Sequence, residues 1–221
     1  MAAVPPVHNS PLSPGNHPVW ALIGPALATI VGLSLVTGVY RLDGVSHLQV
    51  ELGLSNGGFL LTGVVAYVVA AALAFPLGFV LAPRSLTAVI VPAIGVMFLG
   101  VLIVAFGGGP ATLLIGRVLG GLGAGAAVGT TVALLRPLDG NRRIAALAVA
   151  AVGAVALVIA PLVNQVVSEA LSFRLAYAIA LPFLFAALLA ATITGIVLAV
   201  TRRPTPPPGY GMPNPTQQFH H

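Results

Sequence analysis

Long apolar stretches alternate with short polar connections along most of this chain. Six such stretches stand out, over residues 20–40, 57–82, 86–106, 111–136, 144–168 and 174–200. Each is at or above the ~20 residues that an α-helix needs to cross the hydrocarbon core of a bilayer. The pattern predicts an all-α integral membrane protein with one domain of six transmembrane helices, over residues 19–201.

The connections between the predicted helices are short and polar. The most polar one, residues 41–56, is expected to hold a short surface helix. Tight turns are predicted at residues 83–85, 107–110 and 138–143. Residues 1–18 and 202–221 are rich in proline and are predicted to be disordered tails. The first tail has no basic residue, so it lacks the charged start of a cleaved signal peptide.

Arginine residues are distributed unevenly between the two sides of the predicted bundle. One side holds Arg84, Arg136, Arg142, Arg143, Arg202 and Arg203. The other side holds Arg41 and Arg174, together with Asp43, Glu51 and Glu169. Because short cytoplasmic loops carry an excess of basic residues, the first side is predicted to be cytoplasmic. Both termini are then cytoplasmic as well.

Composition agrees with a membrane protein and narrows its partners. Hydrophobic residues make up 58% of the chain, charged residues make up 6%, and the mean hydropathy is +1.06. A soluble domain carries roughly 25% charged residues. The arginines behind the net charge of +5 lie mostly at span ends, so they indicate membrane lipids rather than nucleic acid as partners. The absence of lysine and the abundance of Ala, Val, Gly and Pro predict a GC-rich, bacterial gene and a location in the bacterial cell membrane.

The fourth span combines a basic residue with a run of glycines. Arg117 lies near its start and is followed by Gly120, Gly121, Gly123, Gly125 and Gly129. A helical glycine costs ~1 kcal/mol relative to alanine in water, but in a membrane unpaired backbone costs more, so the helix persists. The spacing of Gly121, Gly125 and Gly129 is that of GxxxG motifs, at which helices approach closely. We expect a tightly packed interior helix with one buried charge.

Two stretches resemble motifs of the major facilitator superfamily of transporters. The sequence RVLGGLGAG from Arg117 resembles the Arg-x-x-x-Gly motif of that superfamily's fourth helix. The stretch 160–189 resembles the junction of the fifth and sixth helices in its drug:proton antiporters, which carries Gly-Pro, Ser-Trp-Arg and Asn-Leu-Pro. The counterparts here are Ala160-Pro161, Ser172-Phe173-Arg174 and Ala180-Leu181-Pro182. The resemblance implies the N-terminal six-helix half of such a transporter, built from two inverted three-helix repeats.

The chain departs from that family at positions that matter for transport. Family members have twelve helices in two halves, whereas six spans are predicted here. Their loop between helices 2 and 3 reads Gly-x-Leu-Ala-Asp-Arg-x-Gly-Arg and gates the cytoplasmic side. The corresponding segment here reads GFVLAPRS, in which Gly78 and Arg84 remain and the acidic residue is missing. The proton antiporters carry an Asp in helix 1, and the first span here has no carboxylate.

Three polar residues within the spans are candidates for binding a substrate or lining a cavity: Arg117, Asn164 and Gln165. An ionisable residue inside a span is a functional candidate by default. The alternative for Arg117 is structural, holding helix ends through hydrogen bonds to backbone carbonyls. Asn164 and Gln165 have the alternative of bonding between helices. Pro161 and the five glycines are assigned to helix shape and packing.

The sequence is compatible with two classes of function. The sequence shows no nucleophile with its base, no carboxylate pair and no metal-ligand cluster, so we predict no enzymatic activity, no metal and no cofactor. In the first class the chain is an accessory subunit of a larger membrane complex for lipid or solute transport, or for respiration. In the second it is a half-size transporter that acts as a homodimer or with a partner half. The missing carboxylates favour the first class, and the retained Arg117 favours the second.

Overall fold

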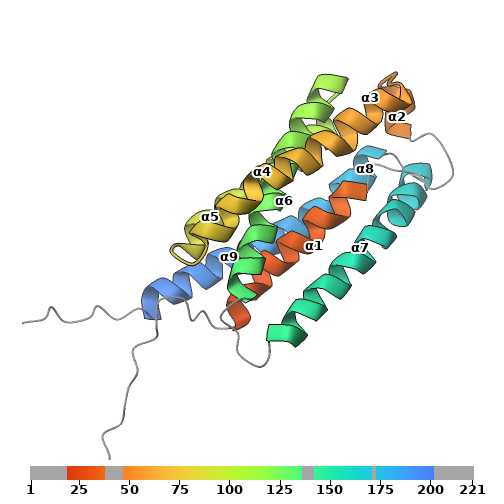
Figure 1. Cartoon of the computed structure of the whole chain (residues 1–221). Helices are drawn as coiled ribbons and strands as arrows, with labels where there is room; N and C mark the ends of the chain where they lie inside the picture. The colour runs from red at the N-terminus through yellow and green to blue at the C-terminus, as the bar shows by residue number, and fades with distance from the viewer. Residues whose placement is uncertain (1–18, 38–46, 136–141, 171–172, 202–221) are drawn as a thin grey trace, which may run out of the picture.

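The computed structural model describes residues 19–37, 47–135, 142–170 and 173–201 (Figure 1). These residues form helices joined by short turns, with no strand among them. The elements are η1 (Val19–Leu22), α1 (Ile23–Thr37), α2 (His47–Glu51), α3 (Asn56–Leu60), η2 (Leu61–Val65), α4 (Ala66–Leu81), α5 (Leu86–Phe106), α6 (Pro110–Leu135), α7 (Arg142–Ala170), α8 (Phe173–Ala178) and α9 (Ala180–Thr201). The two predicted tails, together with Arg41, Asp43, Arg136, Asp139, Arg202 and Arg203, lie outside the described residues.

Six helical segments are long and apolar enough to cross a membrane. They cover Trp20–Thr37, Asn56–Leu81, Leu86–Phe106, Pro110–Leu135, Ala146–Val167 and Arg174–Thr201. The prediction of six apolar spans is confirmed, and their ends differ from the predicted ones by at most two residues wherever the structure describes both sides of the end. Hydropathy alone located the spans because each is bounded by a short polar turn.

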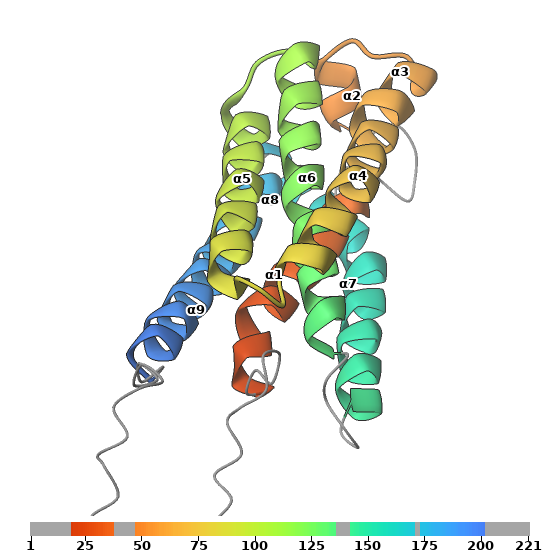
Figure 2. The ribbon, with the colours of Figure 1, turned by 60° about the vertical axis from the view of Figure 1, so that its left-hand side comes forward.

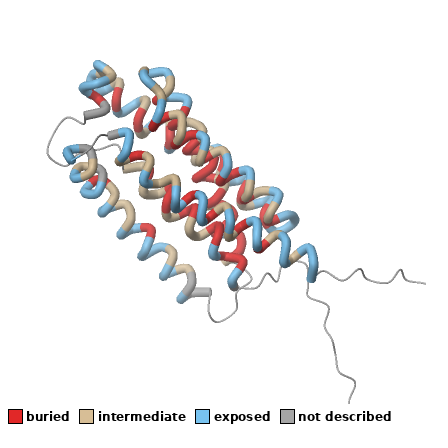
Figure 3. The backbone as a smooth tube through the Cα atoms, turned by 180° about the vertical axis from the view of Figure 1, so that it is seen from behind, coloured by how far each residue is buried: buried red, intermediate tan, exposed pale blue. Residues whose placement is uncertain are grey.

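Helix α6 occupies the centre of the bundle and contacts α1, α4 and α5 (Figure 2). Its span is 67% buried, the highest value among the six. Helix α9 packs against α1 and α5, while α7 lies along α1 at the edge of the bundle, with 11% of its span buried. Figure 3 shows the same contrast, because buried positions follow the inner helices and α7 is largely exposed or intermediate.

The second span is one continuous run of helix that changes its pitch near the start. Ser55 caps the beginning of α3, since its hydroxyl accepts a hydrogen bond from the Gly58 N–H at 3.1 Å. The next element, η2, is a π-helix, in which the Ala66 N–H donates to the carbonyl of Leu61, five residues earlier. A π turn is wider than an α turn and often marks a functional position. The carbonyl of Gly63 lies within this turn.

The sixth span is interrupted, whereas the sequence predicted one helix over residues 174–200. Helix α8 ends at Ala178 and α9 begins at Ala180, with Ile179 in a turn between them. Pro182 explains the break, because it has no N–H to donate to the Ala178 carbonyl and its ring collides with that carbonyl. Helix α7, by contrast, continues through Pro161.

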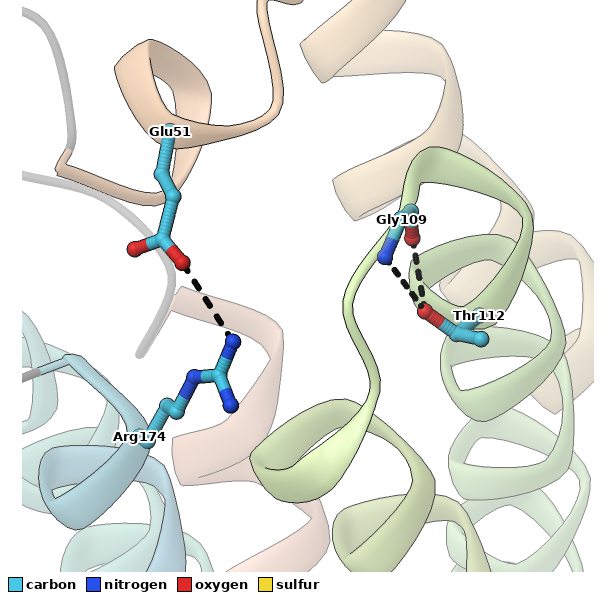
Figure 4. A network of polar contacts seen from close by, with 4 residues as sticks. All are labelled: Glu51, Gly109, Thr112 and Arg174. Carbon is cyan, nitrogen blue, oxygen red and sulfur yellow. Dashed lines mark hydrogen bonds and ion pairs between the residues drawn. The ribbon is translucent and has the colours of Figure 1, made fainter.

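Helix α2 is the short helix expected in the first connection, and an ion pair joins it to the sixth span. Glu51 Oε1 lies 3.4 Å from Arg174 Nη2 of α8 (Figure 4). Both side chains are nearly half exposed, and pairs of this kind contribute only ~0–1 kcal/mol. At the same end of the bundle, Thr112 fixes the start of α6: its hydroxyl donates to the Gly109 carbonyl at 2.7 Å and accepts from the Gly109 N–H.

The beginning of η1 and the end of α9 lie at the same end of the bundle, as an even number of spans requires (Figure 2). The turn between α4 and α5, in which Arg84 is exposed, lies at that end as well. Helices α2, α3 and α8 lie at the opposite end. The assignment of the first end to the cytoplasm remains a prediction from the arginine distribution.

Reporter fusions test that assignment. We expect a reporter at Phe219 to be active on the cytoplasmic side and a reporter inserted within residues 41–56 to be active on the opposite side. A reporter placed after Arg84 should match the one at Phe219, because both positions belong to the arginine-rich side. Equal sidedness of the Phe219 and 41–56 fusions would contradict the six-span topology.

Candidate functional site

Arg117 is completely buried, with 0% of its side chain surface exposed. It lies two turns into α6, the central helix. Its guanidinium donates four hydrogen bonds: Nε to the Gly63 carbonyl, Nη1 to the Leu35 carbonyl and the Tyr177 hydroxyl, and Nη2 to the Val36 carbonyl. These partners come from three other spans, so one side chain connects the first, second, fourth and sixth spans.

Two of the acceptors lie in the last turn of α1. The Leu35 and Val36 carbonyls accept at 2.6 Å and 3.2 Å. The last carbonyls of an α-helix have no partner within the helix, and they form the negative end of its dipole. A cation at this position gains ~0.3–1 kcal/mol on a surface and up to ~2 kcal/mol when partly buried. Arg117 therefore caps α1 from a neighbouring helix.

The second span contributes both a carbonyl and an aromatic face. Nε of Arg117 donates to Gly63 in the π turn, and Cζ lies 4.3 Å from the centre of the Tyr67 ring. A desolvated cation–π contact of this kind is worth about 2 kcal/mol. The Tyr67 hydroxyl donates to the Gly32 carbonyl of α1 at 2.7 Å. Gly120 gives the ring its room, because a Cβ there would lie 3.1 Å from it.

The sixth span reaches the arginine through α8. The Tyr177 hydroxyl accepts from Nη1 at 3.0 Å, and its side chain is 6% exposed. Because the helix breaks at Ile179, α8 is a separate short segment that carries Tyr177 inward and Arg174 outward. The same segment thus contacts the buried arginine and the exposed Glu51.

No carboxylate of the described residues takes part in this cluster. Glu51 and Glu169 are the acidic residues in that part of the chain; the first pairs with Arg174, and the second accepts from Gln165 at 3.5 Å. The charge of Arg117 is therefore compensated by carbonyl and hydroxyl dipoles and by an aromatic face. This arrangement corresponds to the structural alternative for Arg117, in which its donors hold helix ends.

Helix α4 packs directly against the glycines of α6. A Cβ added to Gly121, Gly125 or Gly129 would fall far inside the contact distance of a backbone carbonyl, that of Tyr67, Ala71 or Phe75 respectively. Gly78 of α4 stands in the same relation to the Ala126 carbonyl of α6. The two backbones are so close that no side chain fits between them, as the GxxxG spacing predicts.

Other small residues of α6 contact α5 and α1. A Cβ on Gly123 would collide with the Ala93 carbonyl and with Met97 of α5. On the α1 side, the hydroxyls of Thr29 and Thr131 lie 2.9 Å apart. Because Thr131 donates its proton to the Ala127 carbonyl at 2.9 Å, Thr29 is the donor in this pair.

The remaining sequence candidates that the structure describes are not among the residues that accept hydrogen bonds from Arg117. Gln165 is on α7 and bonds to Glu169 of the same helix, and the side chain of Asn164, also on α7, is outside the described residues. Pro161 is a buried position of α7. Gly78 lies in the last turn of α4 and serves packing, whereas Arg84 lies in the loop and is exposed. None of the described side chains among them contacts the guanidinium of Arg117 through a hydrogen bond.

None of the five residues around Arg117 was singled out from the sequence: Leu35, Val36, Gly63, Tyr67 and Tyr177. A tyrosine in the middle of an apolar span was a usable signal, since a buried Tyr hydroxyl needs a partner. Leu35, Val36 and Gly63 offered no such signal, because each acts through its backbone carbonyl. Within the described residues, no group of three or more His, Asp or Glu residues could hold a metal ion.

The fold and the cluster together define a polytopic, all-helical membrane protein organised around a buried arginine. No protein-family model and no curated protein matches the chain.

Proposed function

We propose that this chain is a non-catalytic accessory or structural subunit of a larger bacterial membrane complex, with a fold related to one half of a major facilitator transporter. The observation that supports the proposal most directly is the set of hydrogen bonds that the buried Arg117 donates. Four of its five N–H groups donate to carbonyls and a hydroxyl of three other spans, so it holds the bundle together. A transport site needs polar groups that are free to exchange a ligand or a proton.

The pairing of the spans supports the relationship to a half-transporter. Two inverted repeats would make spans one to three equivalent to spans four to six. The contact of α4 with α6 would then correspond to that of α7 with α1, and the contact of α5 with α6 to that of α9 with α1. All four contacts are present, as are the self-equivalent ones of α1 with α6 and α5 with α9.

The six described spans hold no Asp, Glu or His side chain, which also favours a supporting role. Proton coupling needs a group that gains and loses a proton inside the membrane, and arginine remains protonated in proteins. Glu51 and Glu169 lie near span ends. Alternating access also needs two bundles that rock about a site between them. The residues that the structure describes supply one such bundle of six spans.

A half-size transporter that pairs with itself or with another half is the second candidate. The irregular helices favour it, because π turns and broken helices occur often at binding sites in membrane proteins. Both the π turn at Leu61–Val65 and the break at Ile179 lie around Arg117.

Purification and reconstitution separate the two candidates. We expect the chain, purified in mild detergent from its own membrane, to retain other subunits in fixed ratio. The isolated chain in liposomes should show no proton-driven substrate flux. Recovery of the chain alone or as a homodimer, with robust flux in liposomes, would establish the transporter instead.

A further inference from the structure

Each polar group around Arg117 lies where a regular α-helix ends or is interrupted. The Leu35 and Val36 carbonyls belong to the last turn of α1, and the Gly63 carbonyl belongs to the π turn. Tyr177 lies two residues before the break at Ile179. Helix ends and π turns present carbonyls that the regular ladder does not use. The fold thus gathers three irregular segments around one point.

The groups gathered there are electron-rich and uncharged. They are three carbonyl oxygens, one hydroxyl oxygen and one aromatic face. Such a set attracts a cation and repels an anion. The oxygens accept from all three nitrogens of the guanidinium, while the ring of Tyr67 lies 4.3 Å from its central carbon. A planar guanidinium can donate to all of these oxygens while its flat face lies against the ring, and a compact ammonium cannot.

We propose that Leu35, Val36, Gly63, Tyr67 and Tyr177 form a binding site for a planar cation of the guanidinium class, whose resident ligand is the Arg117 side chain. We call these five residues the guanidinium cage. When Arg117 is truncated, the cage takes up a free guanidinium compound from solution. Anions do not enter it. This inference goes beyond the proposed function and holds whether or not the chain is an accessory subunit.

Chemical rescue of Arg117→Ala tests the cage. The substitution removes the atoms of ethylguanidinium, so this compound is the probe. Ethylammonium keeps the positive charge but lacks the planar set of N–H donors. Ethylurea keeps planar N–H donors but lacks the charge. Each is added at the same millimolar concentration during solubilisation in detergent, and the midpoint of thermal unfolding is measured for Arg117→Ala, for the unsubstituted chain and for Arg84→Ala, which alters an exposed arginine.

We expect ethylguanidinium to raise the midpoint of Arg117→Ala progressively, with the logarithm of its concentration above the dissociation constant, because a ligand that binds only the folded state stabilises it by RT ln(1 + [L]/Kd). It should not raise the midpoint of the other two proteins, and neither comparison compound should match it on Arg117→Ala. Equal effects of the three compounds, or no effect of any on folded Arg117→Ala, would overturn the proposal.

A measurement on the unsubstituted chain decides the matter if Arg117→Ala does not accumulate. The Nε–H signal of Arg117, assigned by its loss in Arg117→Lys or by selective labelling, should exchange slowly with D₂O. It should not move when chloride, phosphate or acetate is added. A saturable shift with any of these anions would identify Arg117 as an anion ligand and overturn the cage.

Discussion

Replacing Gly125 by alanine should destabilise the bundle, and replacing it by leucine should prevent assembly. The new Cβ would press on the backbone carbonyl of Ala71, which cannot rotate away as a side chain can. Helix α4 would have to move as a unit and would lose its contacts with α6 along the whole face. We expect a cost at or above the upper end of the ~1–3 kcal/mol typical of overpacking. Size-exclusion chromatography and thermal unfolding in detergent measure it.

Gly95 provides the matched control for this substitution. It is also a glycine within a transmembrane helix, α5, but it is exposed and a Cβ there would meet nothing within 4 Å. Gly95→Ala and Gly95→Leu should therefore behave like the unsubstituted chain. Normal assembly of Gly125→Leu would show that α4 does not pack on the glycine face of α6.

Truncating Arg117 to alanine should harm folding before it harms any transport. The substitution leaves three carbonyls and a hydroxyl without their donor in the centre of the bundle. A buried polar group without a partner costs ~1–3 kcal/mol, and the contact with the Tyr67 ring is lost as well. We expect a large fall in the yield of folded protein and in its unfolding temperature.

Arg84→Ala is the control for the loss of an arginine, because Arg84 is exposed in the turn between α4 and α5. It should leave stability unchanged. Flux assays on the same proteins complete the comparison. Robust uptake by the isolated chain that Arg117→Ala abolishes while stability and expression stay normal would contradict the structural role and support the half-transporter.

The spans could be predicted from the sequence because hydropathy reports the solvent around each segment. The glycine spacing on α6 similarly predicted a close helix contact. It did not identify α4 as the partner, since a GxxxG face accepts any helix with small or flat side chains. The break at Ile179 was missed, although the clash between the Pro182 ring and the carbonyl four residues earlier is a local rule that could have located it.

The surroundings of Arg117 were less predictable for a different reason. Hydrogen bonds to carbonyls at helix ends were one of the two roles predicted for Arg117 from the sequence. Which carbonyls would serve could not be foreseen, because every residue has one and no side chain distinguishes Leu35 or Val36. The π turn that presents Gly63 also lies in an unbroken apolar stretch and has no sequence signal.

The position of Arg117 also constrains how the chain is made. An arginine costs roughly 2.5–3.5 kcal/mol on insertion at the centre of a span, and Arg117 lies two turns into its own span, so its charge still needs the partners that the other spans supply. Leu35, Val36, Gly63 and Tyr67 all precede it in the chain. The nascent fourth span therefore leaves the insertion machinery next to helices that are already synthesised and can receive its charge. Tyr177 is made last, and its arrival with α8 closes the cluster.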